Sequence, residues 1–176
     1  MKKYEFTGET KQVGFFGNIT LKRIRATMEF GIVKIGDLGG WIEKEENLSH
    51  KGDAWVCGNA KVWGDAKVWG DAKVCGNAKV WGDAKVWGDA EVCGNAEVFS
   101  ISHVLAIGPI GSRNDFTTFF RDKDSEITVK CGCFLGKIDK FLEKVCETHG
   151  DSKYAIVYRT AVEIAKQQID LSEEKQ

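Results

Sequence analysis

The chain has 176 residues, which is enough for one ordinary domain or two small ones. Its composition, 43% hydrophobic and 29% charged, is that of a globular protein and not of a disordered chain. The formal net charge of -1 argues against a strongly basic nucleic-acid-binding surface. No apolar run reaches the roughly 18 to 20 residues of a membrane-spanning helix, and no apolar signal segment follows the charged start. We therefore expect a cytoplasmic protein with reduced thiols and no membrane partner.

Residues 1–47 are predicted to form an N-terminal β capping segment. The alternation in residues 20–26 predicts one strand, and the apolar run in residues 30–35 predicts another. Residues 36–42 are rich in glycine and are expected to be a turn-rich approach to the next unit. The repeat that follows these residues predicts a solenoid. A solenoid needs a cap because its open end exposes strand edges and core.

A six-residue repeat follows, with the pattern V-x-G-[DN]-A-[KE]. Its valines stand at positions 56, 62, 68, 74, 80, 86 and 92, and Val98 opens an incomplete eighth unit. A β-branched residue followed by Gly-Asp or Gly-Asn indicates a short strand and a tight turn. A period of six with an aliphatic first position is typical of a parallel β-helix.

A second period of 18 residues lies inside the first. Cys57, Cys75 and Cys93 share this spacing, and so do the tryptophans that replace cysteine in the other hexads. Three hexads per coil predict a three-sided solenoid in residues 48–100, with about three coils. Val and Ala should fill the interior, and the Cys or Trp next to each Val should point outward.

These hexads resemble the left-handed β-helix of the hexapeptide-repeat superfamily, which includes many acyltransferases. The preceding block F-G-x-V-K-x-G-D-L-G-G-W-I-E, residues 30–43, resembles bacterial and phage-borne hexapeptide-repeat proteins that are known only as candidate transferases. The resemblance implies a mainly β fold, family membership and a phage setting. It implies no mechanism, because the same solenoid serves enzymes, scaffolds and binding proteins.

Residues 101–176 are predicted to form a small α/β module of three strands and two helices. The strands are expected at residues 103–108, 116–121 and 126–131, and the helices on either side of Gly150. About 75 residues make a marginal core, so the module should dock onto the solenoid or onto a second chain.

The loop between the first two of these strands is the best candidate for a ligand site. It contains Gly111, Ser112, Arg113 and Asn114, and Arg121 would approach it if the strands pair as a hairpin. Free backbone N–H groups and a guanidinium suit a phosphate or carboxylate, so the expected ligand is a small anion such as a nucleotide. An ordinary hairpin loop is the alternative.

The aromatic columns are the best candidate for an interface. They consist of Trp63, Trp69, Trp81, Trp87 and Phe99. Exposed apolar stripes usually mark an interface, which predicts a homo-oligomer, either a trimer or a dimer. Burial by the capping segments of the same chain and ligand binding on bare Trp remain as alternatives.

No metal site or cofactor is predicted. The cysteine column is a ladder and not a set of four convergent ligands, and the Cys131-Gly132-Cys133 pair with Cys146 lacks a fourth ligand. One Asp per turn supplies too few oxygens for calcium.

The leading function is therefore a non-enzymatic oligomeric scaffold that binds a small anionic ligand or a host protein. The alternative is a hexapeptide-repeat acyltransferase that uses His103 or His50 as its general base. The hexads run without any insertion, so they leave no obvious place for an acyl-carrier pocket.

Overall fold

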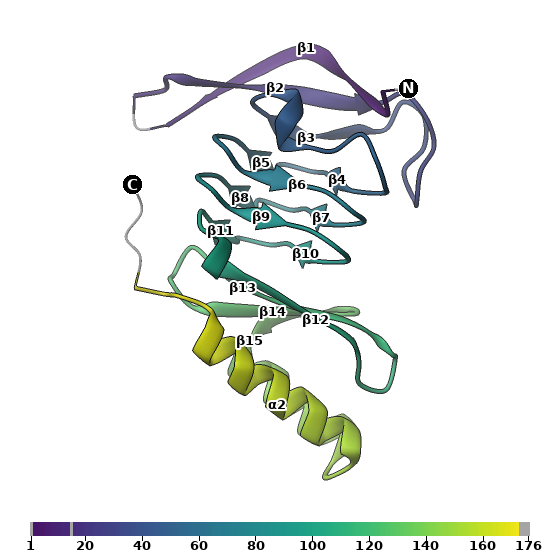
Figure 1. Ribbon diagram of the computed structural model, residues 1–176, viewed down its shortest axis with the longest axis vertical. Helices are drawn as coiled ribbons and strands as arrows, with labels where there is room; N and C mark the ends of the chain where they lie inside the picture. The colour runs from purple at the N-terminus through teal and green to yellow at the C-terminus, as the bar shows by residue number, and fades with distance from the viewer. Residues whose placement is uncertain (1, 15, 173–176) are drawn as a thin grey trace.

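The computed structural model describes residues 2–14 and 16–172, and it has three parts stacked along one axis (Figure 1). The first part is an antiparallel β unit of β1 (Tyr4–Val13), β2 (Ile19–Ala26) and β3 (Leu38–Ile42). β3 then pairs in parallel with β5, so the N-terminal unit continues directly into one side of the solenoid.

The second part is a parallel β-solenoid built from two-residue strands. These are β4 (Trp55–Val56), β5 (Lys61–Val62), β6 (Lys67–Val68), β7 (Lys73–Val74), β8 (Lys79–Val80), β9 (Lys85–Val86), β10 (Glu91–Val92) and β11 (Glu97–Val98). Strands three apart in the chain pair in parallel, which gives the solenoid three sides.

Each side of the solenoid is named after the residue that follows its first strand. The Cys57 face is β4-β7-β10, the Trp63 face is β5-β8-β11, and the Trp69 face is β6-β9. The repeat valines and alanines are buried inside, for example Val74 and Ala78 at 0% exposure. The turns depend on glycine: Gly70 has a φ of 73°, and a Cβ atom there would lie 3.0 Å from the backbone nitrogen of Gly88 in the next coil.

The third part is a four-stranded antiparallel sheet with two helices. It contains β12 (Val104–Ile110), β13 (Asp115–Arg121), β14 (Ile127–Cys131), β15 (Phe134–Lys137), α1 (Ile138–His149) and α2 (Lys153–Gln168). Short 3-10 helices, η1 (Glu45–Asn47) and η2 (Ile101–His103), precede the first full coil and follow the last. Phe119, Val129, Phe141 and Tyr158 belong to a core that this part forms for itself.

The C-terminal sheet closes the open end of the solenoid. The Glu91 N–H donates to the Thr118 hydroxyl at 3.0 Å, and the Lys123 N–H donates to the Asn95 carbonyl at 3.1 Å. Ala96 also forms an antiparallel bridge with Asp122. Of the two docking arrangements expected for the module, the structure adopts the one on its own solenoid.

The predicted mainly β fold, with a parallel β-helix of about three coils and a C-terminal α/β module, is confirmed. Three local predictions differ. Residues 30–35 form a tight turn with one bridge between Phe30 and Val33, because Gly31 adopts a positive φ of 50°. A strand forms instead at β3, inside the segment that was expected to be rich in turns. A Cβ atom on Gly40 would lie 2.6 Å from the Ala60 carbonyl oxygen, so glycine at this position lets two backbone segments approach closely and does not mark a turn.

The third difference is one more C-terminal strand than expected. Gly132, with a φ of 56°, turns the chain between β14 and β15, so Cys131 and Cys133 stand on either side of a hairpin turn. In the described part of the chain, no helix is both long and apolar enough to cross a membrane.

Candidate functional site

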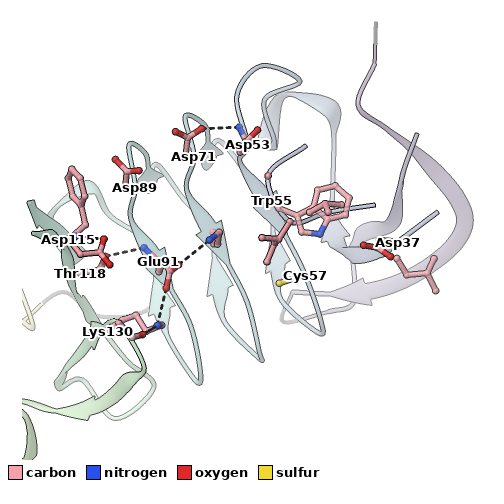
Figure 2. A pocket seen from close by; sticks show the side chains of 17 residues that line it. Asp37, Asp53, Trp55, Cys57, Asp71, Asp89, Glu91, Asp115, Thr118 and Lys130 are labelled. Atoms are coloured by element: carbon pink, nitrogen blue, oxygen red, sulfur yellow. Dashed lines mark hydrogen bonds and ion pairs between the residues drawn. The ribbon is translucent and has the colours of Figure 1, made fainter. Parts of the chain in front are cut away.

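A groove with a volume of about 740 Å³ lies over the Cys57 face. Residues 31–38 of the N-terminal unit bound one end, and β13 and β14 bound the other, so both caps contribute to it (Figure 2). Six carboxylates and two ammonium groups line it: those of Asp37, Asp53, Asp71, Asp89, Glu91 and Asp115, and those of Lys73 and Lys130. The groove is therefore strongly negative.

One rim of the groove is a ladder of carboxylates. Asp53, Asp71 and Asp89 occupy the same corner of successive coils, because the Gly-Asp turn recurs every 18 residues. Figure 2 shows the three side chains in a row, with the Asp53 N–H donating to the Asp71 carboxylate at 3.0 Å. Neighbouring coils are roughly 4.8 Å apart, so these like charges repel one another unless a cation lies beside them.

The floor of the groove carries a chain of ion pairs. Glu91 accepts from Lys73 at 3.3 Å and pairs with Lys130 at 3.0 Å. Burial by itself raises the pKa of Glu91, but hydrogen bonds from Lys130 and Lys73 outweigh burial and hold that pKa below its ordinary value. Both ammonium groups are thus engaged by one carboxylate, and the aspartates of the rim lie outside these pairs.

The apolar part of the floor is held by the N-terminal unit. Trp55 packs edge-on against Tyr4 and Phe30, and the Cys57 thiol lies beside it on the groove side. Lys3 is buried beneath the rim and donates to the carbonyls of Gly52 at 3.1 Å and Ala54 at 2.6 Å.

The pKa of Lys3 is lowered to about 8. Burial is the cause, and the nearby carboxylates of Asp53 and Asp71 offset it in part. Lys3 is not identifiable from the sequence, since nothing in a charged N-terminal tripeptide distinguishes a buried lysine from exposed ones.

The predicted loop is the turn between β12 and β13, and it lies next to the groove. A Cβ atom on Gly111 would come within 2.0 Å of the Tyr158 hydroxyl, so the turn packs on α2. Ser112, Arg113 and Asn114 are exposed. The Arg113 guanidinium lies against Gly132, which lines the C-terminal end of the groove.

The structure separates Arg121 from this loop, which corrects the expectation that the two meet. β12 and β13 do pair as a hairpin, but Arg121 lies at the far end of β13 from the turn. Its side chain is buried, donates to the Ser125 hydroxyl at 2.6 Å and lies 4.9 Å from the centre of the Phe99 ring. Arg121 therefore joins the module to the solenoid.

Both histidines that the alternative reading requires have the same ring nitrogen engaged. Nδ1 of His103 accepts from the Phe99 N–H at 3.3 Å, and Nδ1 of His50 accepts from the Lys3 N–H at 3.2 Å. A neutral imidazole with an accepting Nδ1 carries its proton on Nε2, which cannot then act as a base. Burial lowers the pKa of His50, and His103 is fully buried.

The two aromatic columns differ in how much of their surface the rest of the chain covers. Trp63 stacks on Trp81 at 5.1 Å, and Phe99, next in the column, is covered by His103 and Arg121 of the same chain. Trp69 and Trp87 stack at 5.6 Å and are 36% and 43% exposed. The Trp69 face is thus the more open of the two.

The cysteine column is not fully reduced, which corrects the expectation of free thiols. Cys75 and Cys93 form a disulfide, because stacking brings their Cα atoms within 4.6 Å. Cys57, Cys131, Cys133 and Cys146 are free. Among the described residues, no group of three or more His, Cys, Asp or Glu side chains is arranged to hold a metal ion.

Comparison with known proteins gives no family for this chain. No protein-family model matches it, and no curated protein matches it.

Proposed function

We propose that this protein is a non-enzymatic binding protein whose groove over the Cys57 face holds a positively charged ligand. The observation that carries the proposal is the carboxylate ladder on the rim of a groove of about 740 Å³. Concave sites with a few convergent polar groups are the usual ligand sites of proteins.

The repeat makes the groove suited to an extended ligand. Aspartates on successive coils repeat at roughly 4.8 Å, which matches a molecule that carries several positive charges along its length. The solenoid core is packed with valine and alanine, so the distance between the two caps is fixed and the groove is formed before the ligand arrives.

A small anion held by Arg113 is the second candidate. It is favoured by the exposed guanidinium at the C-terminal end of the groove, close to Lys130 across Gly132. In the phage setting that the resemblance implies, either ligand would be a molecule of the host cytoplasm, sequestered by binding. The acyltransferase alternative is less well supported, because both candidate bases have Nδ1 occupied by a backbone N–H.

Isothermal titration with two probes of opposite charge tests the proposal. We expect tetralysine to bind and its affinity to fall steeply when the salt is raised to about 0.5 M, since exposed charges are then screened. Inorganic pyrophosphate is the second probe. If it binds, and Arg113→Ala abolishes that binding while tetralysine does not bind, the second candidate replaces the first.

A further inference from the structure

The cysteine column contains three positions but only one disulfide. Cys75 and Cys93 are bonded, while Cys57, one coil earlier, keeps a free thiol. We infer that the column is a thiol–disulfide exchange site, in which the Cys57 thiol can take the place of Cys93 as the partner of Cys75.

The backbone makes the two pairs equivalent. The Cys57 N–H donates to the Val74 carbonyl at 2.9 Å, and the Cys75 N–H donates to the Val92 carbonyl at the same distance. Each of these two cysteines is therefore positioned against the next coil along the chain in the same way. The Cα separation of 4.6 Å in the bonded pair lies within the normal range for a disulfide, and one coil step between Cys57 and Cys75 meets the same requirement.

The exchange conserves both atoms and electrons. The Cys57 thiolate attacks the Sγ atom of Cys75, a new sulfur–sulfur bond forms there, and the Cys75–Cys93 bond breaks. Cys93 leaves as a thiolate and takes up the proton that Cys57 lost. One thiol and one disulfide are present before and after, so no oxidant or reductant is consumed.

The two states differ in where the thiol lies. In the structure, the free thiol is that of Cys57, which lines the groove (Figure 2). After exchange it would be that of Cys93, which is 6% exposed and followed by Gly94 under the Leu135 side chain. Exchange would therefore remove a nucleophile from the groove and place it beneath the C-terminal module.

The pH dependence has a stated direction. Burial raises the pKa of the Cys57 thiol, Lys73 opposes that shift, and Glu91 adds to it. Below that pKa the reactive thiolate is a minor form, so the exchange rate should rise about tenfold for each unit of pH.

Trypsin separates the three cysteines cleanly, because lysine or arginine flanks each of them. Cys57 falls in residues 52–61, Cys75 in residues 74–79 and Cys93 in residues 86–113. The oxidised full-length protein is incubated without added thiol, quenched with acid, alkylated with N-ethylmaleimide under denaturing conditions and digested. Mass spectrometry then shows which peptides are linked.

At the start we expect only the disulfide-linked peptides 74–79 and 86–113. Linked peptides 52–61 and 74–79 should then appear over time, and their rate of appearance should increase with pH. A Cys93→Ser variant, treated with oxidised glutathione, should form the second link directly. The matched Cys75→Ser variant should form no link between 52–61 and 86–113, because Cys57 and Cys93 are two coils apart and beyond bonding distance. If the wild type keeps a single link at every pH, or if Cys93→Ser forms no link, the exchange site does not exist.

Discussion

The alternation of inward valine and outward lysine decides how single residues behave in the solenoid. Val80 is fully buried inside the solenoid, and Lys85, the last residue of the same hexad, is exposed at the position that precedes the next valine. Lys79, by contrast, pairs with the nearly buried Glu97 at 3.0 Å, so it is unsuitable as a neutral reference position.

We predict that Val80→Asp unfolds the solenoid and that Lys85→Asp does not. An unpaired carboxylate in an apolar core costs several kcal/mol, whereas an exposed substitution stays within about 0.5 kcal/mol. Chemical denaturation followed by circular dichroism measures both variants. Equal stability of the two variants would show that the inward register of valine is wrong.

Lys3 gives a pH-dependent test at the same scale. Its pKa is about 8 in the folded chain and 10.5 when unperturbed, so between these values the unfolded chain binds more protons at this position. The free energy of unfolding therefore gains a contribution that rises with pH across this window. Burial raises the pKa of Tyr4, so tyrosine ionisation opposes the trend above about pH 10.

A Lys3→Met variant isolates this contribution, because it keeps the Tyr4 environment and removes the titrating amine. Relative to the variant, the wild type should become more stable from about pH 8 to about pH 10. Parallel stability profiles would mean that burial does not lower the pKa of Lys3.

At the scale of elements, the hexads, β2 and most strands and helices of the C-terminal module could be predicted from the sequence, but the way the caps dock on the solenoid could not. A strand of two residues repeated every six is set by local side-chain size and turn chemistry. β13 instead crosses the end of the solenoid, and its role depends on a contact between Thr118 and Glu91 that are 27 positions apart. Nothing in the local sequence of β13 identifies which strand edge it covers.

Thr118→Val should weaken the attachment of the C-terminal module. The variant removes the acceptor of the Glu91 N–H in a buried place, which costs about 1 to 3 kcal/mol. The reference is Thr160→Val on the exposed side of α2, where little change is expected. Urea denaturation would contradict this account if the two variants were equally stable.

The Trp69 face belongs to the same scale, because it is a sheet side that the caps leave open. If the chain is an oligomer, Trp69→Ser combined with Trp87→Ser should shift it toward the monomer. Trp63→Ser combined with Trp81→Ser should leave the assembly intact, since Phe99, the last ring of that column, is covered by Arg121 of the C-terminal module. Sedimentation velocity at tens of micromolar (about the range where stable oligomers persist) measures both, and a monomeric wild type would overturn the oligomer.

At the scale of the whole molecule, the groove exists because two distant segments flank one face of the solenoid. The Asp ladder could be read from the repeat, but its partners, residues 31–38 and β13–β14, are separated from it in the chain. The predicted loop was near the site, and Arg121 was assigned to it wrongly. Arg121 follows the turn by most of the length of β13, and at roughly 3.3 Å per residue an extended strand carries it to the far end of the hairpin.

The repeat itself supplies the most direct test of the groove. Asp71 and Asp89 line it, while Asp65 and Asp83 occupy the same hexad position at another corner, outside it. Titration calorimetry with tetralysine compares Asp71→Asn with Asp89→Asn against Asp65→Asn with Asp83→Asn. The first pair should weaken binding about tenfold, from roughly 0.5 to 1 kcal/mol per lost ion pair, and the second should leave the affinity unchanged. Equal losses of affinity in both double variants would mean that tetralysine responds to the overall charge of the protein, and that the groove is not its binding site.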